Sequence, residues 1–272
     1  MGSQNIQTYQ INNYQNKIRE KILSSFQRVH NSKVSTQINQ KFKPESNIEI
    51  EAFKQKMHSV MFKDDVFKEV YTTPSTNQEV IKIENELKNM GVYANFNDDL
   101  SLAQTTLKAL TKIKTKGYRL PNEIFTMSPS EDKTQGYTFC VKTSGKEKYS
   151  PIFLKKDLVE NYSYDANKEM LRKIGLRPLT VDTPEGTIFH EMGHYLHNLN
   201  GYNRETNQKI WDNVISSNKY ELAREVSTYA FDGDRCGCDF VAEVFAGTMN
   251  GEKYSNAVMD LYYALNGPKI HF

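Results

Sequence analysis

The sequence feature that most constrains this chain is the motif His-Glu-Met-Gly-His at positions 190–194. Histidines four residues apart lie one above the other on a helix, so the imidazoles of His190 and His194 can bind the same metal ion. Glu191 points about 100° away around the helix axis, where it can accept a proton from a water without being a ligand. The spacing therefore predicts two metal ligands and a general base.

The residues around this motif predict a helix over 183–199. Asp182 and Thr183 are good N-cap residues, and Pro184 suits the first turn. Apolar residues recur at spacings of three and four and form a stripe opposite the two histidines: Ile188, Met192, Tyr195, Leu196 and Leu199. We therefore expect one face of the helix to pack on the core and the other to face a cleft. This two-faced pattern disfavours the alternative of a solvated helix with two surface histidines.

Two glycines, Gly186 and Gly193, share a third side of the expected helix. Because a glycine has no Cβ, the backbone of another segment can come close at both positions. We expect such a close approach along this side of the helix.

The composition limits the classes of protein to which the chain can belong. Its 272 residues suffice for one large domain, or for one domain with a helical appendage. A formal net charge of +2 is too near neutral to indicate nucleic-acid binding. Because no apolar run approaches ~18 residues, and no Sec-type signal is visible, we expect neither a membrane span nor that secretion route. Three cysteines fit a reducing compartment, such as a cytoplasm, better than a disulfide framework.

The first 60 residues differ from the remaining 61–272. They are rich in glutamine and asparagine, and they contain nine Lys or Arg against four Glu. Apolar residues at helical spacing predict one amphipathic helix over 10–30, whereas 31–47 has the composition of a linker. We interpret 1–60 as a loosely attached polar, basic arm. The alternative interpretation is a docking or delivery segment that binds a partner.

The residues after the arm predict an α+β domain. Helical periodicity comes first, a period-two pattern follows, and helical periodicity returns from the metal-binding motif onward. The expected helices cover 48–61, 77–90, 98–115, 205–216, 220–230, 239–249 and 255–265. The expected strands cover 124–127, 137–142 and 150–154.

A catalytic zinc site needs a third protein ligand beside the two histidines. The candidates are His197, Cys236, Cys238, Asp239 and Glu243. His197 lies one helical turn beyond the motif, so we interpret it as a surface histidine or as support for a ligand. Asp239 and Glu243 are four residues apart on one face of an expected helix. One of them can therefore bind the metal while the other hydrogen-bonds a ligand histidine.

The sequence resembles a known family over 183–250. The motif His-Glu-x-Gly-His, followed at 239–246 by Asp-Phe-Val-Ala-Glu-Val-Phe-Ala, is similar to the zincin metallopeptidases related to anthrax lethal factor. That group includes the Pro-Pro endopeptidases and the zincin domains of phage head proteins and polymorphic toxins. The resemblance implies a zincin-like catalytic domain with a small mixed sheet, the HExxH helix and a C-terminal helical subdomain, here preceded by a helical N-terminal region.

The resemblance also implies roles for residues beyond the motif. Asp239 matches the third zinc ligand of the family, and Glu243 matches the carboxylate that supports a ligand histidine. Tyr229 matches a tyrosine whose hydroxyl helps to stabilise the oxyanion. Because the family usually has glutamate where this chain has Asp239, Glu243 remains the alternative ligand.

The motif and the resemblance together predict a zinc-dependent endopeptidase. It would bind one Zn²⁺ per chain and hydrolyse peptide bonds of a protein or peptide substrate. The implied context is an effector or toxin delivered into a host cytosol, or a phage-associated protease of the virion. The alternative is a zinc-stabilised structural or binding protein without turnover. The intact Glu191 favours the enzyme, because the general base is the residue that turnover requires.

Overall fold

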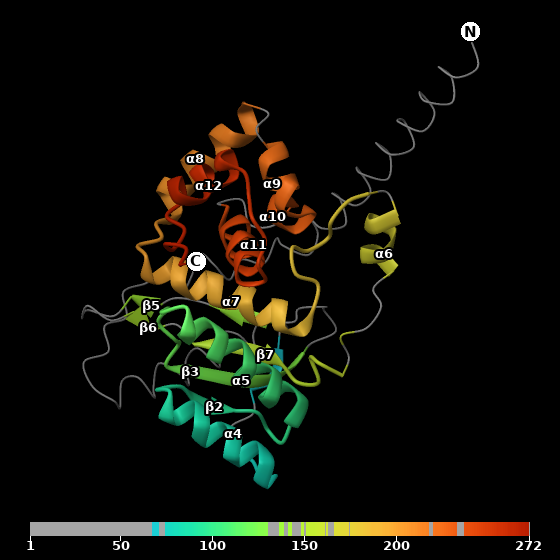
Figure 1. The fold of residues 1–272 in the computed structure, drawn as a ribbon, viewed down its shortest axis with the longest axis vertical. Coiled ribbons are helices and arrows are strands. Elements are labelled where there is room, and N and C mark those ends of the chain that lie inside the picture. The colour runs from blue at the N-terminus through green and yellow to red at the C-terminus, as the bar shows by residue number, and fades with distance from the viewer. Residues whose placement is uncertain are drawn as a thin grey trace. The chain divides into compact units, whose positions relative to one another are not determined.

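Helices and strands alternate through the first part of the chain that the structure describes (Figure 1). The computed structural model describes residues 67–70, 74–129, 136–138, 141–142, 148–149, 151–160, 162, 166–173, 175–217, 220–232 and 237–271. The arm proposed over 1–60, and the helices expected over 10–30 and 48–61, lie outside these residues. Within the described ranges, no helix is both long enough and apolar enough to cross a membrane.

Five strands of the described residues form a mixed sheet around β3 (Glu123–Pro129). β2 (Tyr93–Asn95) pairs with β3 in parallel, and β1 (Phe67–Val70) pairs antiparallel with the later part of β3. On its other side, β3 pairs in parallel with β7 (Ile152–Lys155), which pairs antiparallel with β4 (Gly136–Thr138). The sheet is therefore parallel in its centre and antiparallel at β1 and β4.

The strands expected over 124–127 and 150–154 are confirmed as β3 and β7. The strand expected over 137–142 is instead divided between β4 and a separate two-stranded hairpin of β5 (Val141–Lys142) and β6 (Lys148–Tyr149). The sequence pattern does not predict β1 or β2, because strands of three or four residues are too short to show a clear alternation.

Two helices, α4 (Gln78–Asn89) and α5 (Leu100–Thr115), precede β3 within two residues of their expected bounds. Each begins at a side-chain cap: the Asn77 side chain accepts a hydrogen bond from the Glu79 amide, and the Asp99 side chain accepts one from the Leu102 amide. Their apolar faces supply fully or nearly fully buried core residues: Val80, Ile83, Leu87, Leu110 and Ile113.

The His-Glu-Met-Gly-His motif lies on α7 (Pro184–Leu199), which follows the shorter α6 (Ala166–Lys173). The Thr183 hydroxyl oxygen accepts a hydrogen bond from the Gly186 amide at 3.0 Å, which confirms the expected N-cap. In Figure 1, α7 runs between the sheet and the C-terminal helices. The apolar stripe opposite the histidines packs in the core: Ile188, Met192, Tyr195 and Leu196 are buried.

The helices after α7 are α8 (Arg204–Ser216), α9 (Tyr220–Val226), α10 (Thr228–Asp232), α11 (Cys238–Met249) and α12 (Asn256–Ala264). The prediction of a single helix over 220–230 is wrong, because the helix is interrupted at Ser227, which separates α9 from α10. The Ser227 hydroxyl oxygen accepts a hydrogen bond from the Ala230 amide and so caps the new helix. The described part of the chain is an α+β fold, as expected.

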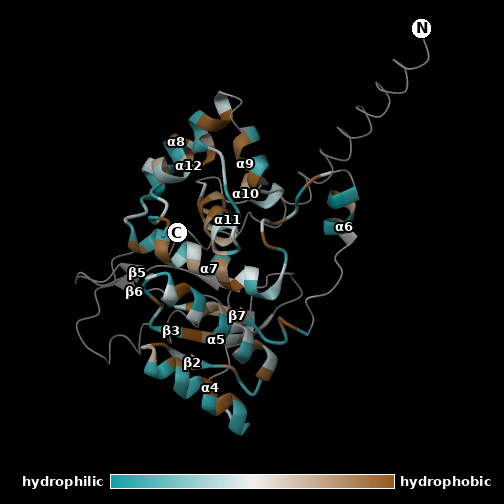
Figure 2. Cartoon of the chain, viewed as in Figure 1, coloured by the Kyte–Doolittle hydropathy of each residue, from teal (hydrophilic) through white to brown (hydrophobic). Residues whose placement is uncertain are grey.

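The packing of α11 against α7 sets the position of the motif. Figure 2 shows α11 as a predominantly apolar helix, and its side chains Phe240, Val244 and Phe245 are completely buried. A Cβ atom added at Gly193 would lie 2.7 Å from the Cα atom of Ala242 on α11. The expected close approach at this glycine is therefore confirmed, and α11 is the segment that makes it.

We expect Gly193→Ala to destabilise the protein. The added methyl meets backbone rather than a flexible side chain, so α7 and α11 must separate, and overpacking of this kind costs about 1–3 kcal/mol or more. Urea unfolding would measure the change, with Thr111→Ala on an exposed position of α5 as the control. Equal stability of Gly193→Ala and the unmodified chain would contradict the close packing of the two helices.

Candidate metal centre

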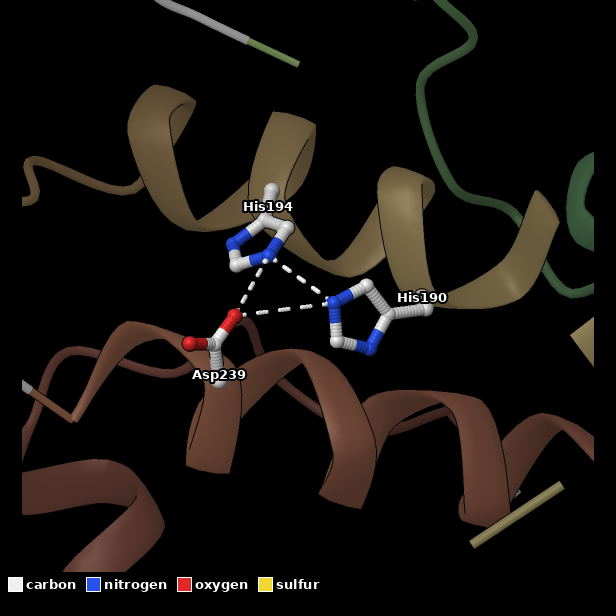
Figure 3. Close-up of side chains that lie close together, drawn as sticks. All are labelled: His190, His194 and Asp239. Atoms are coloured by element: carbon white, nitrogen blue, oxygen red, sulfur yellow. Dashed lines mark hydrogen bonds and ion pairs between the residues drawn. The ribbon is translucent and has the colours of Figure 1, made fainter. Parts of the chain in front are cut away.

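Three side chains that can ligate a metal converge between α7 and α11 (Figure 3). His190 and His194 come from successive turns of α7, and Asp239 comes from the first turn of α11. The two Nε2 atoms are 3.0 Å apart, and Asp239 Oδ1 lies 3.2 Å from His194 Nε2 and 3.7 Å from His190 Nε2. Ligand atoms around a tetrahedral zinc with bonds of ~2.0–2.1 Å are about 3.3 Å apart. The three residues therefore fit a zinc ion.

The position of Asp239 depends on the backbone conformation of Gly237 at the start of α11. Gly237, just before the helix, adopts a left-handed conformation with φ of 72°, and a Cβ there would lie 2.8 Å from the Trp211 ring. Only glycine suits both conditions. Burial raises the pKa of Asp239, but the close imidazoles of His190 and His194 outweigh it and hold that pKa well below its usual range. The helix N-terminus also favours a carboxylate here, so Asp239 is suited to bind a cation.

Glu243 lies one turn after Asp239 and contacts the opposite nitrogen of His190. Its Oε1 atom is 2.7 Å from His190 Nδ1, while its Oε2 atom accepts a hydrogen bond of 2.6 Å from the Thr180 amide. A carboxylate can only accept here, so Nδ1 carries a proton and Nε2 is directed toward His194 and Asp239. The two carboxylates, which helical spacing alone leaves equivalent, thus face different nitrogens of His190.

The charge of His190 depends on the same two carboxylates. Burial opposes protonation of the ring, but the nearby Asp239 carboxylate and the hydrogen bond to Glu243 outweigh it and raise the pKa of His190 to about 10. Any metal ion that binds Nε2 must therefore displace a proton.

The other two expected residues are neighbours of His190, Glu191 along the chain and Tyr229 through a contact between rings. Glu191 is buried on α7, next to His190 in the chain. The ring of Tyr229, on α10, has its centroid 5.5 Å from that of the His190 ring, at an interplanar angle of 66°. The residues named from the sequence as ligands, base, support and oxyanion donor are therefore gathered around His190.

His197 and Cys238 do not belong to this group. His197 is buried rather than at the surface, and its Nε2 atom hydrogen-bonds the Leu265 carbonyl oxygen at 2.7 Å. The Asn207 side chain donates to the same carbonyl at 2.9 Å, so His197 fastens α7 to the end of α12. Cys238 is buried at the start of α11, and Cys236 lies outside the described residues. Among those residues, the possible metal ligands that converge are His190, His194 and Asp239.

Sequence reasoning missed Thr180, whose backbone amide holds Glu243. The contact is made by the main chain and spans 63 positions, so no residue type or spacing marks it. Only the path of the loop before α7 reveals it.

Comparisons with known proteins return no match to this chain: no family model, no curated protein and no solved structure matches it significantly.

Proposed function

We propose that this chain is a zinc-dependent endopeptidase with a zincin-like catalytic domain. The observation that carries the proposal is the arrangement around His190. Its Nε2 atom faces His194 and Asp239, and its Nδ1 atom is held by Glu243. Three ligands directed to one point, with an outer carboxylate that orients one of them, are typical of a catalytic zinc site.

The mixed sheet, the motif helix and the C-terminal helices agree with a zincin-like domain. Agreement at the level of architecture is an analogy, so the site carries the greater weight. The resemblance of 183–250 to the zincins related to anthrax lethal factor supports the same assignment.

The roles of the residues follow from their positions. His190, His194 and Asp239 would hold Zn²⁺, which acts in such sites as a Lewis acid and lowers the pKa of a water toward ~7. Glu191 would accept the proton from the attacking water and pass it to the leaving amine. Tyr229, beside His190, would donate a hydrogen bond to the developing oxyanion.

The proposed substrate is a protein or peptide, and no nucleic acid is expected as a partner at a formal net charge of +2. The family resemblance favours an effector or toxin that acts in a host cytosol, or a phage-associated protease. In either setting we expect the same zinc centre to perform the reaction.

The test of the proposed function combines metal analysis with cleavage of a peptide library. Elemental analysis of the purified full chain should find close to one Zn²⁺ per chain, because two imidazoles and a carboxylate suit zinc. Mass spectrometry of the library should find cleaved peptides that disappear after zinc removal. Absence of zinc even after its addition would sink the proposal. Zinc without any cleavage would favour a zinc-stabilised binding or structural protein.

Zinc affinity should rise with pH. Because the pKa of His190 is about 10, its ring stays protonated on both nitrogens throughout the neutral range. Each zinc ion that binds Nε2 therefore releases at least the proton of that nitrogen. The affinity should therefore increase about tenfold per pH unit between roughly pH 6 and 8. Competition with a chromophoric chelator of known pH dependence would measure it. A flat profile would show that His190 is not a protonated ligand, and Glu243→Gln should make the rise level off at lower pH.

A further inference from the structure

The loop before α7 contains a short segment, 177–180, that contacts three of the C-terminal helices. The carbonyl oxygen of Arg177 accepts a hydrogen bond of 2.8 Å from the Thr228 amide, and that of Pro178 accepts one of 3.2 Å from the Tyr229 amide. These donors are the first two residues of α10, whose amides lack partners within a helix. The 177–180 segment thus accepts the hydrogen bonds of the first amides of α10, the helix that contains Tyr229.

The same segment is fastened to α9 and to Glu243 on α11. The Thr180 amide donates 2.6 Å to Glu243 Oε2, and the Thr180 hydroxyl donates 3.2 Å to the Val226 carbonyl at the end of α9. Both Thr180 and Glu243 are buried. In this setting a hydrogen bond to a carboxylate is strong, and its loss removes one of the donors to Glu243, beside His190 and the Ser227 side chain.

The side chain of Arg177 makes two further contacts at the more exposed side of the segment. Its guanidinium donates to the Thr180 carbonyl oxygen and, at 2.8 Å, to Glu252 Oε1, just beyond the end of α11. Arg177 and Glu252 are both about one-third exposed, so this ion pair is weaker than the buried contacts. The Arg177 side chain nevertheless links the two ends of the 177–180 segment to each other and to Glu252.

We propose that the 177–180 segment is the positioning element of the metal centre, because it holds Glu243 behind His190 and Tyr229 beside His190. The inference rests on the proposed function and adds residues that touch neither metal nor substrate. Pro178 and Thr180 act through their main-chain groups, two residues apart. A shift of this segment displaces the support of a metal ligand and the oxyanion donor together.

The first test compares two substitutions of Thr180 in the full chain. Thr180→Pro removes the amide hydrogen that Glu243 accepts, whereas Thr180→Ala keeps it and removes only the side chain. Loss of the outer partner of a ligand histidine, here Glu243, typically weakens metal binding ~10–100-fold, and the Thr180 amide acts through this partner. We expect at least about tenfold weaker zinc binding for Thr180→Pro, and a smaller loss for Thr180→Ala. Equal zinc affinities of the two folded variants would overturn the role of the amide.

The second test uses no proline substitution and does not depend on catalytic activity. In Glu243→Ala, the Thr180 amide loses its acceptor, so the segment loosens and the Tyr229 amide loosens with it. Hydrogen exchange followed by NMR should be about tenfold faster or more at both amides. The Ala103 amide, bonded to the Asp99 carbonyl in α5, should be unchanged. Faster exchange at Thr180 with no change at Tyr229 would show that the segment does not couple the two groups, and would overturn the inference.

The two tests separate this inference from the proposed function. If the unmodified chain binds no zinc, the proposed function fails, while the exchange experiment still decides whether 177–180 couples Glu243 to Tyr229. If zinc binds and peptides are cleaved but the Tyr229 amide does not respond to Glu243→Ala, the positioning inference alone fails.

Discussion

Glu191→Gln is expected to abolish peptide-bond hydrolysis while zinc remains bound. Glutamine has nearly the same size as glutamate but cannot accept the proton of the attacking water. General acid–base catalysis contributes typically about 10²–10⁴-fold, and we expect a loss of at least that size. The three proposed ligands are untouched, so the zinc content should stay the same. Cleavage of the best library peptide and elemental analysis, on the same preparation, would measure both.

The matched control for this substitution is Glu185→Gln on the same helix. Glu185 lies in the first turn of α7 and forms an ion pair of 2.9 Å with the exposed Lys108. Its loss removes the same charge from the same helix but should change activity little, because such pairs contribute modestly. If Glu191→Gln kept most of the activity, the proposed role of Glu191 as the general base would be wrong.

Asp239→Ala is expected to lose zinc under mild chelation, whereas Glu243→Ala should retain it with ~10–100-fold weaker binding. Asp239 Oδ1 completes the triangle with the two Nε2 atoms, so its removal leaves two protein ligands and no carboxylate ligand. Glu243 faces His190 from the side of its far nitrogen, Nδ1, so its removal leaves all three proposed ligands in place. Dialysis against graded chelator, followed by elemental analysis, would rank the variants.

Asp260→Ala, at an exposed position of α12, serves as the control for the loss of one acidic side chain. The opposite ranking, with zinc lost from Glu243→Ala and kept by Asp239→Ala, would reverse the two proposed roles. Loss of zinc from both variants to the same extent would indicate that Glu243 is itself a ligand.

The sequence by itself determined the features that arise within a few residues of one another. The two motif histidines share a face of α7 because helical geometry places residues four apart on one side. The Thr183 cap, the apolar stripe and the glycine side of α7 follow from the same local rules, and all appear in the structure. The bounds of α4 and α5 were predictable for the same reason. Local periodicity and capping act on the chain wherever it folds.

Local rules were insufficient where a contact joins distant segments. The break of α9 from α10 at Ser227 depends on carbonyls of 177–180 that receive the Thr228 and Tyr229 amides. β2 exists because β3 offers a partner, since three residues form no stable strand alone. His197 is buried because α12 ends against it. None of these partners is adjacent in the sequence.

The roles proposed for Asp239 and Glu243 show which features local sequence rules predict and which depend on tertiary packing. Helical spacing placed both carboxylates on one face of α11, and family resemblance favoured Asp239. Only the tertiary structure decided which ring nitrogen of His190 each one faces, because that depends on how far α11 is shifted along α7. The contact of Gly193 with Ala242 and the bond from Thr180 to Glu243 set this shift. Periodicity determines the direction of a side chain around its own helix, but the position of one helix along another comes from packing between residues far apart in the chain.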